Sequence, residues 1–201
     1  MAKEFEIKYH LDSAAQLQRV LSDSAIAAFL QTPWAQIPMK TTYFDTPERA
    51  LSQRHWTLRH RLEGTRHVLC LKTPTLDELA RNEFEVEATC PDRAALAQLC
   101  RIGAPEELLE LAAPERLLAV CGAKFQRQVA TVRFPDGSSA AISGDVGILH
   151  GTEQTMDFCE MELELNSGSQ DAMLEFADKL AAVYGLKTEP KSKFARARVL
   201  R

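Results

Sequence analysis

The feature of this 201-residue sequence that most restricts its fold is the placement of charged residues at every second position in several short stretches. Charged and apolar side chains alternate in residues 3–11, and residues 159–165 read CEMELEL. Successive side chains of a β-strand point to opposite faces, so this period of two predicts strands with one charged and one apolar face. We expect strands at 3–11, 39–46, 55–64, 67–73, 81–88, 123–134, 139–149 and 159–165, with an Asp-Gly hairpin turn at 136–137.

Helical patterns lie between these strands. The stretch 12–30 begins with Asp and Ser, which are good N-cap residues, and has apolar residues at helical spacing. Residues 91–120 are rich in Ala, Leu and Glu and indicate two or three short helices, and residues 170–183 indicate an amphipathic helix. The chain therefore belongs to the α+β class, and its length suits one domain covering residues 1–201.

The charged faces could belong to an ordinary sheet or to a barrel. Alternation by itself favours an antiparallel sheet with one face in water. The signs of charge are sorted by strand, however: Glu dominates 4–6, 83–87 and 160–164, whereas Arg and Lys dominate 59–61 and position 72. Like charges two residues apart repel, so this sorting favours strands that close into a barrel, with charged faces lining the lumen and apolar faces packed against helices.

Such a lumen suits a polyphosphate that is bound together with a divalent cation. Carboxylates grouped on one face are the oxygen ligands that Mg²⁺ or Mn²⁺ prefers. Arg59 and Arg61 can each bind two phosphate oxygens, and Lys8 and Lys72 can act as point charges. The metal would neutralise the charge that develops in phosphoryl transfer and lower the pKa of an attacking water.

Composition argues against several other classes of protein. The 24 basic and 28 acidic residues give a net charge of −4, which makes the chain a poor general nucleic-acid binder. No apolar run has the length of a signal peptide or a membrane span, so we expect a soluble cytoplasmic protein with no membrane contact. The five cysteines form no C-x-x-C pair and the five histidines have no metal-ligand spacing, so we expect reduced thiols and no zinc site.

The charged motifs also follow a recognisable order along the chain. The opening Glu4-x-Glu6-x-Lys8 is followed by YFDTP at 43–47, L-R-x-R at 58–61, Lys72, E-x-E at 83–85, Arg127, D-x-G at 145–147, E-x-E-x-E at 160–164 and Ser192-Lys193. This order resembles that of the CYTH superfamily, also called the triphosphate tunnel metalloenzymes. The match covers essentially the whole chain, and the sequence most resembles the bacterial inorganic triphosphatases.

The resemblance implies an eight-stranded antiparallel β-barrel, the triphosphate tunnel, with a polar lumen and flanking helices. It implies hydrolysis of inorganic triphosphate to diphosphate and phosphate with Mg²⁺ or Mn²⁺. Metal ligands would be Glu4, Glu6, Asp145, Glu160, Glu162 and Glu164, and the triphosphate would be bound by Lys8, Arg59, Arg61, Lys72, Arg127 and Lys193. The catalytic set would be Lys8, Glu83 and Glu85, where the two glutamates either lie near a second metal and the attacking water or orient the basic residues.

The chain departs from the family pattern in two respects. Many relatives carry a further carboxylate in the strand before D-x-G, where this chain has Ala141 and Ser143, and Gly144 is expected to loosen that strand. The bacterial enzymes often continue into a helical, histidine-rich second domain, which is expected to be absent from this chain or removed from it.

The family also leaves other functions open. It includes thiamine triphosphatases and class IV adenylate cyclases, and a non-catalytic polyphosphate-binding module is an alternative of a different class. We expect a monomer or a homodimer.

Several other residues are expected to be structural. Lys124 lies on the opposite strand face from Arg127 and should point outward, whereas Arg81 could line the tunnel mouth or pair with Glu83. We expect core packing of Trp34 and Trp56, a hydrogen-bonded core position for Tyr43 rather than a contact with a lumen lysine, and a solvated helix face for Arg196, Arg198 and Arg201.

Overall fold

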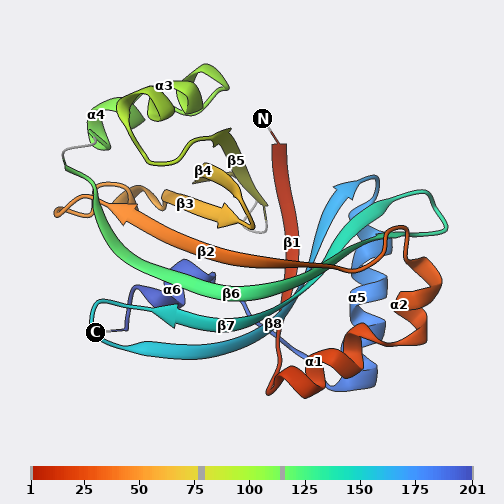
Figure 1. Cartoon of the computed structure of the whole chain (residues 1–201). Helices are drawn as coiled ribbons and strands as arrows, with labels where there is room; N and C mark the ends of the chain where they lie inside the picture. Colours follow the sequence, from red (N-terminus) through yellow and green to blue (C-terminus); the bar gives the residue numbers. More distant parts are fainter. Residues whose placement is uncertain (1, 77–79, 114–115, 201) are drawn as a thin grey trace.

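Eight strands form a closed antiparallel barrel in the computed structural model, which describes residues 2–76, 80–113 and 116–200 (Figure 1). Their order around the barrel is β5-β4-β3-β2-β6-β7-β8-β1, and the pairing of β1 with β5 closes the ring. The predicted barrel is thus confirmed. Its strands are β1 (Ala2–His10), β2 (Ala35–Asp45), β3 (Thr57–Glu63), β4 (Arg66–Pro74), β5 (Ala80–Glu87), β6 (Leu118–Arg133), β7 (Ser139–His150) and β8 (Thr155–Ser167).

Helices flank the barrel at both ends of its strands (Figure 1). They are α1 (Ala14–Leu21), α2 (Ser24–Phe29), α3 (Arg93–Arg101), α4 (Leu108–Leu111), α5 (Gln170–Tyr184) and α6 (Lys193–Ala197), with a 3₁₀ turn, η1 (Ser52–Arg54), and a short strand, β9 (Lys187–Thr188), that pairs with the end of β1. Among the described residues, none of these helices combines the length and the apolar composition needed to span a bilayer.

The helix expected over residues 12–30 is two helices. Ser13 caps α1, and the side chain of Asp23 accepts a hydrogen bond of 2.7 Å from the backbone N–H of Ala25. Asp at an N-cap satisfies a free N–H at the start of a helix, so Asp23 begins a second helix instead of continuing the first. The prediction of one helix was therefore wrong at Ser22–Asp23.

Three strands begin earlier than their alternation indicates. Strand β2 begins at Ala35 instead of residue 39, β6 at Leu118 instead of 123, and β8 at Thr155 instead of 159. Each extra segment is paired with a neighbouring strand, so its extent is set by its partners and not by its own pattern. Pro38 is accommodated in β2 because it lies just beyond the last residue that pairs with β3.

Strand β7 is continuous through Gly144, which was expected to loosen it. A Cβ atom on Gly144 would lie 2.8 Å from a methyl group of Leu21 and 2.9 Å from methyl groups of Leu17. The glycine therefore allows α1 to pack closely against the outside of the barrel.

Apolar side chains lie mainly outside the barrel wall, under the helices. Helices α1, α2 and α5 pack against β1, β6, β7 and β8, and Trp34 contacts this cluster. Helices α3 and α4 cover β3, β4 and β5, where Trp56 is buried. Both tryptophans thus have the expected core positions. The alternate, charged positions of the same strands face the lumen.

A third apolar cluster lies inside one end of the barrel. There, Phe194 and Ala197 of α6 pack against lumen-facing residues of β2, β6 and β8, among them Tyr43, Phe125 and Phe158. Helix α6 thereby brings its own side chains into the lumen.

Candidate active site

The strand register places the charged residues of β1 and β8 next to each other in the lumen. Glu6 lies opposite Glu164, and Lys8 lies opposite Glu162. The residues between them, such as Ile7 and Tyr9, contact the helices outside the barrel. Because alternate side chains take opposite faces, the carboxylates and Lys8 point inward.

The opposite wall of the lumen brings basic side chains from β3 and β4 against carboxylates of β5. Lys72 lies 2.5 Å from Glu4 of β1 and 3.4 Å from Glu83. Arg59 lies 3.1 Å from the same Glu83 oxygen. Lys72 therefore links the two strands whose pairing closes the barrel.

Arg61 follows Arg59 by two residues on β3 and lies on the same wall. Its guanidinium is 2.5 Å from Glu63 and 3.5 Å from Glu85. Glu85 also lies 3.8 Å from Arg59, so each of the two arginines contacts a carboxylate on β5. Glu63 was not among the predicted site residues, although it follows Arg61 by two positions and hence shares its strand face.

A second ion-pair network joins β6, β7, β8 and α6. Arg127 donates to both oxygens of Asp145, at 2.8 and 2.7 Å, and to Glu162 at 2.7 Å. Lys193 lies 2.7 Å from Asp145 and 2.9 Å from Glu162 and also contacts Glu160. These buried carboxylates therefore share two cations from different elements.

Helix α6 supplies a second basic residue that the sequence did not indicate. Arg196 is buried and its guanidinium contacts Glu160, whose side chain is 0% exposed. The expectation that Arg196 lies on a solvated helix face was wrong, because α6 packs inside the barrel and its Lys193 face points at β8. The spacing of three residues from Lys193 is the signal that places both side chains on one helix face. Arg198 is exposed as expected, and Arg201 lies outside the described residues.

Two glutamates of these networks are held in their charged form. Burial alone would raise the pKa of Glu162, but Lys193, Arg127 and Lys8 outweigh burial and lower it well below its usual range. Burial likewise opposes ionisation of Glu83, yet Lys72 and Arg59 lower its pKa to about 2. Both carboxylates are therefore anions at neutral pH.

Three other lumen carboxylates behave in the opposite way. Burial, reinforced by the nearby Glu4 and Glu83, raises the pKa of Glu164 to about 7. Burial is also the main cause that raises the pKa of Glu4 and of Glu160. A buried carboxylate that is costly to ionise gains from a nearby cation, which is the environment of a metal site.

Two groups of three carboxylates could hold a divalent cation. In each, one oxygen per residue lies within 4.8 Å of the other two. Ligand sets made only of oxygen suit Mg²⁺ and Mn²⁺, so the residues present fit the expected ions. The groups are Asp145 with Glu160 and Glu162, and Glu4 with Glu83 and Glu164.

The predicted residues are thus brought together in one lumen, with differences in detail. Glu6 lies outside both carboxylate groups within the described residues and instead accepts a 2.9 Å hydrogen bond from Lys8. Arg81 donates to the backbone carbonyl of His55 and not to Glu83. Lys124 is exposed on the outer face, as predicted.

Two uncharged lumen residues complete the site. Tyr43 is buried as expected, with its ring 5.1 Å from that of Phe194, but its hydroxyl has no hydrogen-bond partner among the described residues. Cys70, which the sequence did not indicate, donates to Glu83 at 3.1 Å. Burial raises the pKa of this thiol to about 12, so it is protonated at neutral pH and is a poor ligand for a hard cation.

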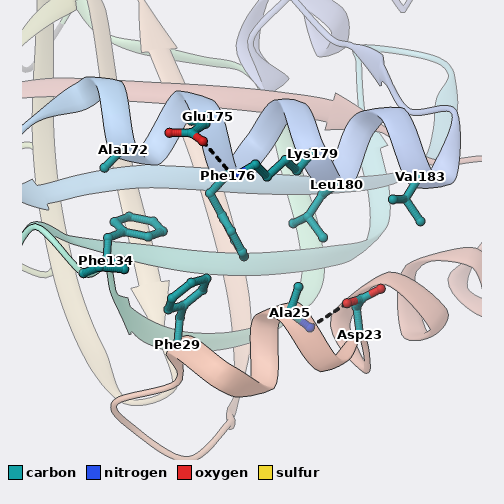
Figure 2. A pocket seen from close by; sticks show the side chains of 11 residues that line it. Asp23, Ala25, Phe29, Phe134, Ala172, Glu175, Phe176, Lys179, Leu180 and Val183 are labelled. Atoms are coloured by element: carbon teal, nitrogen blue, oxygen red, sulfur yellow. Dashed lines mark hydrogen bonds and ion pairs between the residues drawn. The ribbon is translucent and has the colours of Figure 1, made fainter.

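An aromatic hollow of about 270 Å³ lies apart from these charges, outside the barrel between α2 and α5 (Figure 2). Phe29, Phe134 and Phe176 line the hollow. Its charged residues are Asp23, Glu175 and Lys179, and the last two form an ion pair at the rim. Because the sorted carboxylates and basic residues converge in the lumen, the lumen is the candidate active site.

The fold has counterparts among known proteins. The CYTH domain model matches residues 2–197. A Hippeastrum protein described as a candidate adenylyl cyclase with a dominant triphosphatase activity is similar in structure, with a TM-score of 0.62, 21% identity, and coverage of 97% of this chain and 95% of that one. A candidate adenylate cyclase from Bacillus halodurans gives a TM-score of 0.58 at 18% identity, with 96% of each chain covered. A Pyrococcus horikoshii protein gives 0.56 at 17% identity, covering 96% of this chain and 97% of that one.

Proposed function

The chain belongs to the CYTH family, and from this premise we propose that it is a metal-dependent triphosphatase that hydrolyses inorganic triphosphate to diphosphate and phosphate. One observation carries the proposal: basic side chains from five different elements converge on buried carboxylates in a closed lumen. They are Lys8, Arg59, Arg61, Lys72, Arg127 and Lys193.

Binding of a triphosphate would exchange partners within these networks. Arg59 and Arg61 can turn from Glu83 and Glu85 to phosphate oxygens, because a guanidinium binds carboxylate and phosphate in the same forked geometry. Lys193 approaches from α6 and closes the lumen at one end. The substrate would thus be held from several walls, which fixes the reacting phosphoryl group in position.

The carboxylates released by this exchange would be free to bind metal. Asp145, Glu160 and Glu162 are one candidate set, and Glu4, Glu83 and Glu164 are the other. Bound Mg²⁺ or Mn²⁺ would supply charge neutralisation at the phosphate oxygens and a lower pKa for water.

The protein's own residues perform the remaining tasks. Lys8 lies 2.9 Å from Glu6 and 3.8 Å from Glu162 in the lumen, so its ammonium could stabilise negative charge on a triphosphate bound there. Before substrate binds, Glu83 contacts both Arg59 and Lys72, which supports a role in orienting these basic residues until phosphate replaces the carboxylate as their partner. Glu85 supports Arg61 in the same way.

The aromatic end of the lumen favours a compact substrate. Phe194 packs against Tyr43, and Lys193 lies 5.1 Å from the ring centre of Phe125 and 5.5 Å from that of Phe158. A nucleoside or thiamine group at this end would have to compete for space with the side chains of α6. This supports inorganic triphosphate over ATP and thiamine triphosphate, and hydrolysis over cyclisation.

The proposal is tested by offering the purified protein inorganic triphosphate, thiamine triphosphate and ATP in turn, with Mg²⁺ or Mn²⁺. We expect phosphate release to be fastest from inorganic triphosphate. Release of phosphate from none of the three would rule out the hydrolase, and cyclic AMP formed from ATP would assign the chain to the cyclases of the family.

A further inference from the structure

The outer surface of the barrel carries a groove of about 450 Å³ over β2, β6 and the turn after β7. We call it the outer groove; its lining includes the polar residues Lys40, Thr42, Lys124, His150 and Thr152. The two lysines occupy even-numbered positions of their strands, whereas the lumen residues Tyr43 and Arg127 occupy odd-numbered ones. The outer groove therefore lies on the opposite face of the barrel wall from the proposed active site.

Two lysines lie side by side in the outer groove without a counter-charge. The register places Lys40 directly opposite Lys124, and both are exposed. Within the described part of the chain, neither lysine forms an ion pair and no acidic side chain lines the groove. Like charges directly opposite each other on adjacent strands are destabilising. A bound anion would remove that cost.

The positive charge of this surface is local and opposite in sign to the net charge of the whole chain. The net charge is −4, yet the field of Lys40 extends to the next strand. There it adds to burial and to the neighbouring His67 in lowering the pKa of His60.

A glycine forms part of the outer groove between its polar residues. Gly122 lies between Thr42 on β2 and His150 on β7. A Cβ atom on Gly122 would be 2.7 Å from the backbone oxygen of Thr41, so a larger residue does not fit without moving the backbone. Gly122 itself places no side chain between Thr42 and His150.

These polar groups form two rows along the strands. The lysines make up one row, and Thr42 and His150 make up the other, two residues away. Two residues of a strand span about 7 Å. That is longer than one phosphate ion is wide and matches a chain of a few linked phosphoryl groups.

We propose that the outer groove is a second anion site, which binds a short inorganic polyphosphate chain against Lys40 and Lys124. It is independent of the lumen, and its occupant is held by charge and hydroxyl groups rather than hydrolysed. Neither a metal nor any lumen residue is needed for this binding.

Calorimetric titration with inorganic triphosphate in EDTA tests the proposal, since no divalent metal is then available. We expect the double variant Lys40→Gln/Lys124→Gln to bind one equivalent fewer than the wild type, or to bind that equivalent at least tenfold more weakly. The control Lys179→Gln/Lys187→Gln removes the same charge from exposed positions elsewhere and should bind as the wild type does. Equal stoichiometry and affinity in the two double variants would overturn the proposal, whatever the lumen binds.

Two further measurements define the ligand and its place. Titration followed by amide chemical shifts should move the signals of Gly122 and Thr152, and unmoved signals in this part of β6 and the turn after β7 would contradict the assignment. Hexaglutamate or single phosphate ions should bind this surface at least tenfold more weakly than triphosphate. Equal binding of either would show that the groove does not select polyphosphate.

Discussion

Glu162 is the residue at which the charges of the lumen meet. It accepts hydrogen bonds from Arg127 and Lys193, and Lys8 lies 3.8 Å away. Glu164 lies two residues farther along the same strand, but burial and neighbouring carboxylates raise its pKa to about 7. One strand face therefore carries a fixed anion for the basic residues and an acid that gains from a cation.

Substitution of Lys8 tests whether this arrangement of charges contributes to catalysis. We expect Lys8→Ala to lower the rate of triphosphate hydrolysis at least about tenfold, which corresponds to about 1.4 kcal/mol of lost transition-state stabilisation. Circular dichroism should show a retained fold. Lys179→Ala, an exposed control on α5, should keep the wild-type rate. Equal rates for the two variants would remove Lys8 from the catalytic set.

Glu164 predicts an unusual dependence of stability on pH in the metal-free protein. An acid whose pKa is raised on folding binds its proton more tightly in the folded state, so stability rises as pH falls from about 8 to about 5. Below that range the trend reverses, because Glu83 and Glu162 have lowered pKa values and lose their contribution as they are protonated.

Thermal unfolding of Glu164→Gln in EDTA checks this dependence. The variant should be more stable than the wild type at about pH 8 and should lose most of the gain between about pH 8 and about pH 5. Glu153→Gln, in the turn between β7 and β8, should retain the wild-type profile. The same slope in both variants would contradict the environment assigned to Glu164.

Individual lumen residues could be predicted as far as strand alternation reaches. Arg59, Arg61 and Lys72 were placed correctly in the lumen because a period of two defines a face. Cys70 shares that face but carries no charge, so nothing singled it out. The buried position of Arg196 could not be predicted, because it depends on how the short helix α6 enters the barrel, and tertiary packing decides that.

Helix α6 is the element that completes the lumen. Ser192 caps it, Phe194 anchors it in the apolar cluster, and Lys193 and Arg196 both contact Glu160. The buried carboxylate of Glu160 therefore helps to hold the helix, together with the apolar cluster.

Replacing one partner of that carboxylate should loosen the helix. We expect Arg196→Met to lower the free energy of unfolding by about 1–3 kcal/mol, since it leaves part of a buried charge unpaired. Hydrolysis should also slow, because Lys193 is carried by the same helix. Urea unfolding measures the first effect, with the exposed Arg198→Met as control. An unfolding free energy equal to that of the control would show that Glu160 does not hold α6.

Helices and strands could be predicted where the periodicity of their own residues decides their structure. The charged strands and α5 follow from periodicity. The first residues of β2, β6 and β8 could not be predicted from the sequence, because these segments are strands only through pairing with their neighbours. The break at Asp23 shows that a capping side chain can divide a pattern that is otherwise helical.

At the scale of the whole molecule, barrel closure decides where the charged and apolar faces of the alternating strands lie. Closure of β1 on β5 places the charged faces inside, while α1, α2, α5, α3 and α4 cover the apolar faces. The Glu-rich strands then lie beside strands that carry Arg and Lys, and their side chains form two mixed ion-pair networks in the lumen. The substrate of such a site is decided by what fits between the two networks, which sequence alone leaves open.

The central claim is that this lumen cleaves inorganic triphosphate with a divalent metal, and ³¹P NMR of the reaction tests it most directly. Wild-type protein with Mg²⁺ or Mn²⁺ should convert triphosphate into equal amounts of diphosphate and phosphate. EDTA, or the substitution Arg59→Ala, should slow the conversion at least about tenfold. A triphosphate spectrum that stays unchanged with the folded wild-type protein and either metal would contradict the account.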